Sequence, residues 1–311
     1  MTDYSPSRIG QVNGAGDTSA LFLKVFPGEV LGAFREVNKI MALHIVRTIA
    51  NGKSAQFPAS GKATASYHTP GQILLGQTIN HAERVISVDG LLLADTFVAE
   101  IDEAMNHYDV RQEYAALLGQ SLATKADQQL LQLAVLAARA STTVTGGDGG
   151  SALTDAAAKT DGEVIGSLVF DAAQAMDEKY VPETDRYVAF KPAQYYLAVQ
   201  ATKFLNRDWG GKGELAGAML PQVANMSVIK TNNLPSTVIA AETGANNTYN
   251  GDFSKTSGVA WHKSAFGTVK LRDLKTEREY MIQNQGTLMV AKYAMGHGIL
   301  RPESAVEMGT P

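Results

Sequence analysis

Residues 110–140 read VRQEYAALLGQSLATKADQQLLQLAVLAARA, and this stretch decides the fold. Its apolar residues recur at steps of three and four, the spacing that places side chains on one stripe of an α-helix. Asp109 stands before the stretch at the position of a helix cap, and Arg139 lies in the last turn, where a cation suits the helix dipole. At about 1.5 Å per residue the helix would span roughly 45 Å, which is long for a domain of this size. We therefore expect a rod on which other elements are mounted. The glycines expected to stop it are Gly146, Gly147, Gly149 and Gly150.

The composition excludes several classes of function. The chain has 311 residues, a net charge of −4 and no cysteine, so disulfides, thiolate catalysis and cysteine-ligated zinc are excluded. The overall charge gives no bulk signal for nucleic-acid binding. No apolar run approaches the ~20 residues of a membrane span, and the polar N-terminus lacks the basic head and apolar body of a secretion signal. We therefore expect a protein that is made in a cytoplasm and has no membrane partner.

Residues 52–88 differ in composition from the long helix, because glycines and prolines divide them into short segments. Residues 62–68 and 82–88 read as two strands joined by an apolar connection. Two strands are marginal in water and cannot bury such a tip by themselves. We therefore expect a long two-stranded finger whose tip lies on a neighbouring subunit, with an ordinary hairpin folded back on its own domain as the alternative. The tip residues are Ile73, Leu74 and Leu75.

The rest of the chain alternates helices and strands. Residues 246–258 are polar and rich in glycine and asparagine, which is typical of an exposed loop. Residues 40–49 and 287–295 fit a helix or a strand equally well. The other expected elements are a buried run at 91–99, helices at 101–107, 164–180 and 192 to about 205, and strands at 186–190, 228–230, 237–241 and 268–271.

No stretch carries the residues of a recognisable catalytic, metal or nucleotide site. The six histidines lack the spacing of zinc ligands. Lys53 follows a glycine as in a phosphate-binding loop, but Arg47 stands where that loop needs another glycine. Acidic residues flank His107 as in an acid–base pair, yet they are also typical of the helix starts expected there. The remaining charged residues look like ordinary solvated faces. We therefore expect no enzyme, no cofactor and no metal.

Several blocks of sequence resemble the major capsid proteins of short-tailed, autographivirus-like phages (podoviruses). The blocks follow the order of that family along nearly the whole chain, and the longest are eight residues. The likeness fades between residues 142 and 258. The blocks are Leu21–Phe26, Gly52–Pro58, Asp89–Leu92, Ala104–Arg111, Gly267–Leu274, Ala291–Gly298 and Arg301–Glu303.

This resemblance implies an α+β fold of the Hong Kong 97 type, the capsid fold of tailed phages. In that fold an axial domain is inserted before the chain returns to the peripheral domain, and this return favours a strand at 287–295. The implied regions are an N-terminal arm (1–51), an extended β-loop (52–88), a peripheral domain (89–185 and 261–311) with a spine helix at about 110–140, and an axial domain (186–260).

The function implied by the resemblance is that of a major capsid protein, which self-assembles into the hexamers and pentamers of an icosahedral phage head around double-stranded DNA. We expect assembly in the host cytoplasm and residence in the virion. The expected partners are copies of the chain, a separate scaffolding protein, a portal protein and non-specifically bound DNA, with a decoration protein as a further candidate. The small surplus of Lys and Arg in residues 1–62 fits DNA contact, an acidic partner or the rim of a subunit contact equally well.

The candidate residues for subunit contact lie in the finger, and Asp109 is the candidate helix cap. We do not expect the Lys–Asn cross-link of some relatives of the fold, because nothing marks a buried acid that would catalyse it. The alternatives are an encapsulin-like nanocompartment shell on the same fold and an enzyme of an unrelated α/β fold. The candidate interface residues are Lys53, Phe57, Ile73, Leu74 and Leu75.

Overall fold

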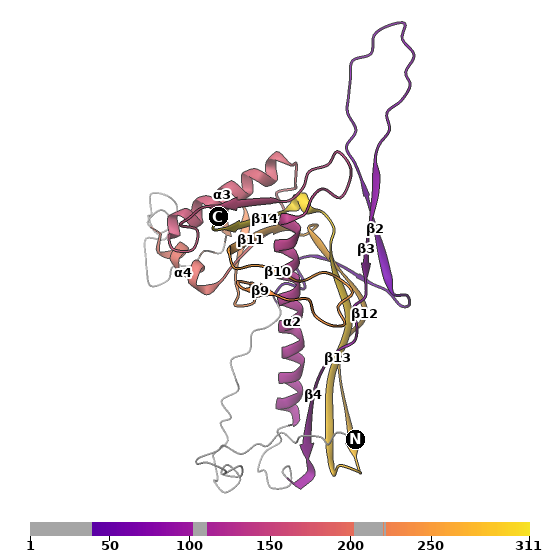
Figure 1. Ribbon diagram of the computed structural model, residues 1–311, viewed down its shortest axis with the longest axis vertical. Coiled ribbons are helices and arrows are strands. Elements are labelled where there is room, and N and C mark those ends of the chain that lie inside the picture. The colour runs from indigo at the N-terminus through magenta and orange to yellow at the C-terminus, as the bar shows by residue number, and fades with distance from the viewer. Residues whose placement is uncertain (1–38, 102–110, 202–219, 221) are drawn as a thin grey trace. The chain divides into compact units, whose positions relative to one another are not determined.

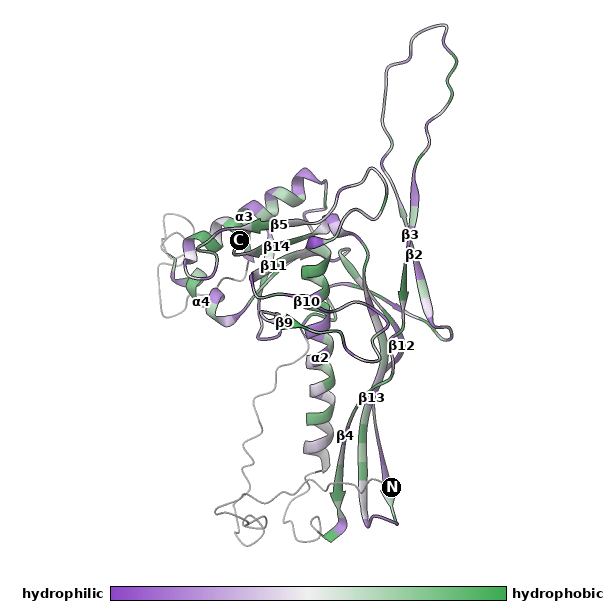
Figure 2. Ribbon diagram, in the orientation of Figure 1, coloured by the Kyte–Doolittle hydropathy of each residue, from purple (hydrophilic) through white to green (hydrophobic). Residues whose placement is uncertain are grey.

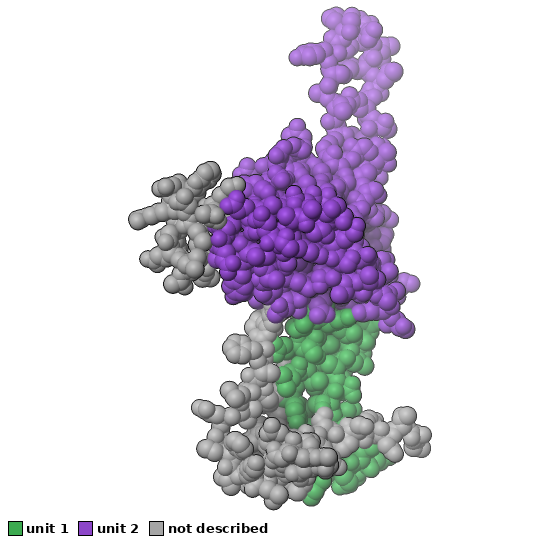
Figure 3. Space-filling model, turned by 60° about the vertical axis from the view of Figure 1, so that its left-hand side comes forward, with its two compact units in different colours: residues 1–38, 90–126, 272–295 green, residues 39–89, 127–271, 296–311 purple. Residues whose placement is uncertain are grey.

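The computed structural model describes residues 39–101, 111–201, 220 and 222–311. The chain forms two compact units, shown in Figure 3. Unit 2 consists of residues 39–89, 127–271 and 296–311, and the described part of unit 1 consists of residues 90–101, 111–126 and 272–295. Both units combine helix and strand, as the α+β prediction requires.

A six-stranded sheet forms the centre of unit 2, with the strand order β5-β14-β11-β6-β8-β7. The central strand β11 pairs antiparallel with both β14 and β6, whereas β6 and β8 run parallel. The strands are β5 (Ser151–Thr154), β6 (Arg186–Phe190), β7 (Gln222–Val223), β8 (Met226–Lys230), β11 (Thr256–His262) and β14 (Ala305–Gly309).

The two faces of this sheet carry alternate residues of the same strands, as the two-residue period of a β-strand requires. On β6, Val188 and Phe190 pack against α3 (Gly162–Glu178) and α4 (Pro192–Gln200). Ala189, between them, packs on the opposite face in the core that contains the second half of α2. Unit 2 is therefore a three-layer structure in which helices cover both faces of one sheet.

The long helix predicted from the sequence is α2 (Arg111–Arg139), so that prediction is confirmed. Figure 2 shows that its second half is the more hydrophobic one. From Asp127 onward nearly every residue is buried in unit 2, including Gln129 and Gln132. A single apolar stripe therefore does not describe the second half of α2, which is surrounded by protein.

The glycine run does not itself end α2, because the helix stops at Arg139. Gly146 has a positive φ of 81° in the following turn. The chain then returns to the helix end, where the Gly150 N–H donates to the Ala140 carbonyl at 3.0 Å. A Cβ atom at Gly150 would lie 2.3 Å from the carbonyl oxygen of Ala138, so only glycine permits this approach.

The finger consists of β2 (Ser54–Ser60) and β3 (His81–Ser87), which pair antiparallel with Ala55 opposite Ile86. The predicted strand at 82–88 is confirmed to within one residue, but the one predicted at 62–68 is wrong. Pro58 misled that prediction, since proline removes a backbone donor. β3 is the sole partner of β2 in the described sheet, so half of the N–H groups of β2 face away from it and a proline is tolerated. Residues 61–80 form the connection, shown in Figure 1.

A second sheet has the order β1-β12-β13-β4. In unit 2, β1 (Ile45–Thr48) pairs parallel with the start of β12 (Phe266–Met281), so the ambiguous segment 40–49 contains a strand. In unit 1, β13 (Gly286–Ile299) pairs antiparallel with β4 (Leu92–Ala99). The strand that the resemblance favoured at 287–295 is therefore confirmed.

The remaining predictions have mixed outcomes. The helix at 164–180 and the strand at 186–190 are confirmed as α3 and β6. Helix α4 begins at Pro192, as expected. Of the strand predicted at 237–241, only β9 (Val238–Ile239) forms. The exposed loop predicted at 246–258 is confirmed only in part: Asn246, Thr248 and Asn250 are exposed, but Tyr249 and Phe253 are buried. That stretch also holds β10 (Gly251–Asp252), and β11 begins within it. The helix predicted at 101–107 lies almost entirely outside the described residues.

We expect Gly150→Ala to lower the free energy of unfolding of the unassembled subunit by about 1–3 kcal/mol, the range for overpacking a tight site. The new methyl group would meet the Ala137 and Ala138 carbonyl oxygens at 2.4 and 2.3 Å. Urea unfolding followed by circular dichroism measures the change. Thr145→Ala in the same loop is the control and should shift the value by less than about 0.5 kcal/mol. Equal stability of the two variants would contradict the proposed tight approach.

Candidate assembly surface

The connection of the finger exposes its apolar side chains. Ile73, Leu74 and Leu75 are 86%, 79% and 92% exposed, and Tyr67 is fully exposed. Figure 3 shows the finger standing out from the rest of unit 2. Scattered single apolar residues on a surface need no explanation, but three consecutive aliphatic residues form a patch of the kind that marks interaction sites.

The root of the finger packs against its own unit. The ring of Phe57 is buried, with the Arg47 guanidinium carbon 4.3 Å from its centroid. Arg47 also donates to the Gln56 carbonyl at 2.7 Å. Lys53 is exposed, and its carbonyl accepts from Val88 N–H at 2.8 Å. The structure thus brings the predicted interface residues into one hairpin, with Phe57 at its packed root and the tip residues at its free end.

Polar contacts tie this root to the loop that follows α2. Lys62 Nζ lies 2.6 Å from a carboxylate oxygen of Asp148, and Asn80 Nδ2 donates to the Thr145 carbonyl at 3.0 Å. The backbone of β13 also lies close to the end of β3: a Cβ atom at Gly296 would be 1.9 Å from the Ser87 carbonyl oxygen. The finger therefore has a base that is fixed to the rest of unit 2.

A cavity of about 210 Å³ lies at this base. Lys179 lines it and donates through Nζ to the Gly149 carbonyl at 2.7 Å and to Ser151 Oγ at 2.6 Å. Burial lowers the pKa of this amino group. Through these contacts Lys179 stabilises the turn that follows α2. The other charged residues that line the cavity are Lys62, Asp148, Arg301 and Glu303.

Asp89 accepts several hydrogen bonds from the stretch that was predicted to be an exposed loop. Its Oδ1 accepts from Asn246 N–H at 2.7 Å and from Asn247 Nδ2 at 2.9 Å, and its Oδ2 accepts from the Tyr249 hydroxyl at 2.5 Å. Burial, with the nearby Asp89 carboxylate, raises the pKa of Tyr249 well above its usual range. The signal that could have indicated this contact is one aromatic residue inside a polar Asn-rich run.

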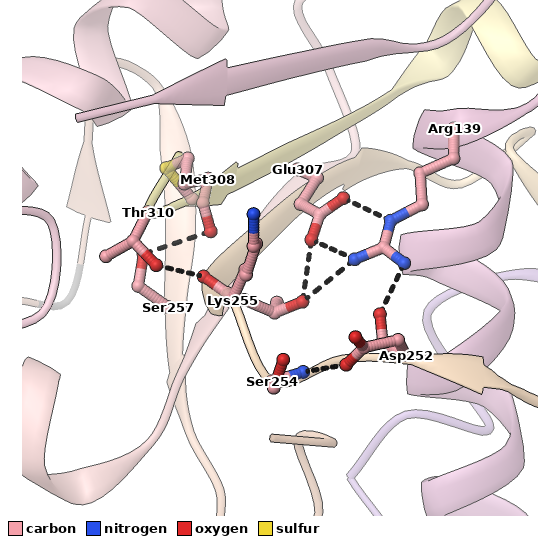
Figure 4. A network of polar contacts seen from close by, with 9 residues as sticks. Arg139, Asp252, Ser254, Lys255, Ser257, Glu307, Met308 and Thr310 are labelled. Carbon is pink, nitrogen blue, oxygen red and sulfur yellow. Dashed lines mark hydrogen bonds and ion pairs between the residues drawn. The ribbon is translucent and has the colours of Figure 1, made fainter. Parts of the chain in front are cut away.

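Arg139, the last residue of α2, binds the end of the helix to the sheet, as Figure 4 shows. Its Nε and Nη2 donate to the two carboxylate oxygens of Glu307, each at 2.6 Å. Nη1 donates to the Asp252 carbonyl at 2.6 Å, and the Thr256 hydroxyl donates to Glu307 at 2.6 Å. The hydrogen bond to Glu307 raises the pKa of Arg139. Such a bidentate pair fixes orientation as well as position.

The expectation that charged residues form ordinary solvated faces is wrong at three buried positions: Asp127, Arg186 and Glu307. Asp127 accepts from the Lys39 N–H at 2.9 Å. Arg186 donates to Asp177 at 2.7 Å, close to the end of α3. Each of these groups satisfies backbone or side-chain partners that lie far away in sequence or at an element end, and a charge that is buried without such partners would be costly.

A buried chain of three polar side chains links His44, the residue before β1, to β12 and β13. His44 Nδ1 must donate to the Ile40 carbonyl at 3.1 Å, because a carbonyl oxygen can only accept. His44 Nε2 therefore accepts from the Thr268 hydroxyl at 2.5 Å, and Thr268 in turn accepts from His297 Nδ1 at 2.7 Å. This order leaves His297 Nε2 as a buried nitrogen that has no hydrogen-bond partner among the described residues. Burial lowers the pKa of His44 to about 4 and that of His297 to about 3, so both are neutral at pH 7.

Two further observations bear on function. Among the described residues, no three His, Asp or Glu side chains gather into a group that could hold a metal ion. Over the same part of the chain, no helix combines the length and the apolar content needed to cross a membrane. The predicted cap Asp109 lies outside the described residues, so its role stays a prediction.

Comparison with known proteins identifies the architecture. A family model of Gp10A-like major capsid proteins matches residues 56–309. The major capsid protein of Escherichia phage T7 is 38% identical over 94% of this chain and 92% of its own length. A solved capsid structure of the cyanophage P-SCSP1u is 42% identical with a TM-score of 0.85, over 100% of this chain and 99% of that one. The mature capsid of bacteriophage PhiM1, 20% identical, shares the fold with a TM-score of 0.78 over 97% of this chain and 96% of that one.

These findings define the class first: the chain has the Hong Kong 97-like fold of phage capsid proteins, as the resemblance predicted. The chain belongs to the Gp10A-like family of major capsid proteins. It is therefore a structural component of a phage virion.

We expect Glu307→Gln to lower the free energy of unfolding by about 1.5–3 kcal/mol, the usual value of hydrogen bonds to charged groups. The amide keeps the volume of Glu307 but removes the charge that Arg139 and Thr256 contact. Lys275→Gln is the control, since Lys275 is exposed in its ion pair with Glu277 and such pairs contribute about 0–1 kcal/mol. Equal effects of the two variants in urea unfolding would show that the Arg139–Glu307 pair does not stabilise the fold more than an exposed ion pair does.

Stability should also fall with acidification. The folded pKa values of His44 and His297 lie below the unfolded value of 6.5, so their contribution is complete above about pH 6.5. It is lost as the pH falls from there toward about 4 and 3, by up to about 1.4 kcal/mol per pH unit for each histidine. Urea unfolding between pH 7.5 and 4.5 measures this slope. His297→Phe removes one titrating group but leaves every carboxylate, so its slope should be shallower than the wild-type slope; parallel slopes would contradict the neutral buried pair.

Proposed function

We propose that the chain assembles into hexamers and pentamers of a closed icosahedral shell around double-stranded DNA, with each finger tip lying on a neighbouring subunit. The observation that carries this proposal is the exposure of Ile73, Leu74 and Leu75 at the end of a hairpin with a fixed base. Full burial of one such side chain is worth about 1.5–3 kcal/mol. Against the described residues the three tip side chains stay 79–92% exposed and gain little of this, which favours a second copy as the partner.

The relatives support this reading. The cyanophage protein, which this chain matches along its whole length, is described as a capsid structure, and the PhiM1 chain is described as part of a mature capsid. A contact made by one surface on a different surface of the next copy generates rings when the rotation closes. Finger-to-neighbour contacts of this heterologous kind suit hexamers and pentamers. This likeness favours a phage head over a nanocompartment shell and over an enzyme.

The regions and partners are part of the same proposal. We assign residues 1–51 to the arm, 52–88 to the extended loop and 186–260 to the axial domain, with the rest of the chain in the peripheral domain. A scaffolding protein, a portal protein and packaged DNA are the proposed partners, with a decoration protein as a further candidate. We also infer that the protein is not an enzyme, because its buried ionisable groups are engaged in structural contacts, as in the Arg139–Glu307 and His44–Thr268 pairs.

Replacing Ile73, Leu74 and Leu75 together by Ser should spare the folded subunit and weaken the shell. The three side chains are largely exposed among the described residues, so the free energy of unfolding of the unassembled subunit should change by less than about 0.5 kcal/mol. Shells should dissociate at lower urea concentration, as measured by light scattering and negative-stain microscopy.

The control replaces two polar neighbours in the same connection, Gln72 and Thr78, by Ser. Both are exposed, so shells of this variant should match the wild type. If the Ile73–Leu75 variant destabilised the unassembled subunit as much as the shell, the tip would be packed within its own chain and the proposal would fail.

A further inference from the structure

Tyr180 has a backbone conformation that tyrosine rarely adopts. Its φ of 59° lies in the left-handed region, where a bulky side chain is crowded by the backbone. The residue follows the end of α3, and the backbone there closes a Schellman motif. Tyr180 N–H donates to the Asp177 carbonyl at 2.9 Å, and Val181 N–H donates to the Met176 carbonyl at 3.0 Å. Glycine is the usual residue at this position, because it adopts the left-handed conformation without strain.

Packing within unit 2 does not explain why this residue is a tyrosine. Tyr180 is 85% exposed, and the Schellman motif uses only its backbone N–H. Lys62 Nζ lies 5.6 Å from the centroid of the ring, but a cation–π contact between exposed groups is weak. Strain that the fold itself does not require indicates a function for the side chain outside the folded subunit.

Tyr180 also lines the cavity of about 210 Å³ at the base of the finger. Charged side chains of both signs surround it: Lys62 comes from the finger, and Arg301 and Glu303 follow β13. An exposed tyrosine beside a hollow with a polar rim is typical of protein–protein contacts. The carboxylates of Asp148 and Glu303 in the cavity wall would repel the phosphates of a nucleic acid. The surface therefore suits a protein partner.

A second copy of the chain is the protein that fits this position. The proposed function places the tip of the finger on a neighbouring subunit, and Tyr180 lies beside the root of the same finger. Each side of the connection 61–80 has about ten residues and reaches at most roughly 35 Å. A compact chain of this length is roughly 40 Å or more across. A neighbour that covers the tip is therefore wide enough to reach the root.

We propose that Tyr180 is an anchor residue of a subunit contact, in which a second copy of this chain covers its ring and the mouth of the cavity beside it. This inference rests on the proposed function and adds a second contact to that of the finger tip. Burial of an aromatic ring often supplies a large share of the energy of a protein–protein contact. The strained conformation is thus retained for assembly and not for folding.

Replacing Tyr180 by Gly separates folding from assembly. Glycine relieves the strain and removes a ring that is mostly exposed, so the ratio of folded to unfolded subunit should rise about fivefold. Urea unfolding of the unassembled subunit measures this ratio. Because each copy loses an aromatic contact, the free-subunit concentration in equilibrium with shells should rise by at least about tenfold. Light scattering of diluted shells measures that concentration.

Tyr180→Asn is a second test variant, since asparagine also tolerates the left-handed conformation, and it should change both measurements in the same direction. If Tyr180→Gly and Tyr180→Asn destabilised the unassembled subunit, the ring would serve the fold. If they left the shells unchanged, no partner would cover the ring. Either outcome overturns the proposal.

Two control variants distinguish the ring from the strain. Tyr180→Phe keeps the ring and the strain, so it should assemble far better than Tyr180→Gly. Ala224→Gly relieves left-handed strain elsewhere, in the turn between β7 and β8, where φ is 49°. It should stabilise the subunit without weakening the shell. Equal assembly losses in Tyr180→Phe and Tyr180→Gly, or a similar loss in Ala224→Gly, would contradict the role of the ring.

Photo-crosslinking in purified shells identifies what covers the ring. The photoreactive residue p-benzoylphenylalanine, incorporated in place of Tyr180, should join two copies of the chain and double its mass on a denaturing gel. Cross-links to a different protein, to DNA or only within one chain would overturn the proposal, as would the absence of any cross-link. Failure of the wild-type chain to form shells would instead overturn the proposed function.

Discussion

The burial of the second half of α2 inside unit 2 is the constraint on which the rest of the structure depends. Leu130, Leu131 and Ala134 are completely buried there, against residues such as Ala189 and Trp261 on one face of the six-stranded sheet. Because alternate residues of a strand face opposite ways, this contact also decides which residues meet α3 and α4. The sheet register and the three-layer order both follow from where the helix lies.

The end of α2 illustrates how polar groups complete this packing. Hydrophobic burial is non-directional and tolerates small shifts of a helix along a sheet. The bidentate pair of Arg139 and Glu307 does not tolerate such shifts, since both carboxylate oxygens have defined donors. Gly150 adds a steric limit at the same end. A helix placed by its apolar side chains is thus fixed in position by one ion pair and one glycine.

The finger, unlike the end of α2, is fixed only at its base. Its base is held by Lys62, Asn80 and the close approach at Gly296, while its tip exposes aliphatic side chains. A rigid base reduces the entropy that the finger would lose when a partner covers the tip. The finger therefore combines a fixed base with an exposed apolar tip. Small gains per contact suffice in a shell, because every copy repeats them.

Sequence reasoning succeeded where one physical signal dominated. Helix periodicity identified α2 and α3, and Pro192 at a first helical position located α4. It failed where tertiary contacts overrode local composition. Pro58 is tolerated within β2 because β3 is the one strand that pairs with it in the described part of the chain, and Tyr249 in the Asn-rich stretch donates to Asp89 and is buried.

Buried charges escaped prediction for a related reason. The partners of Asp127 and Glu307 lie 88 and 168 residues away along the chain, and no local pattern reveals contacts at that distance. Of the candidate site, the apolar tip could be predicted from three consecutive residues, whereas the packed root depends on strand register. Register and long-range pairing are properties of the fold, not of any one stretch.

Hydrogen–deuterium exchange of residues 61–80 tests the central claim, that the finger is completed by a neighbouring subunit. This connection belongs to no strand or helix in the subunit, so its amides should exchange within seconds when the protein is unassembled. In assembled shells the tip amides around Ile73–Leu75 should be protected by at least tenfold, while exchange in the second half of α2 stays slow in both states. Equal exchange of the tip in subunits and shells would contradict the account.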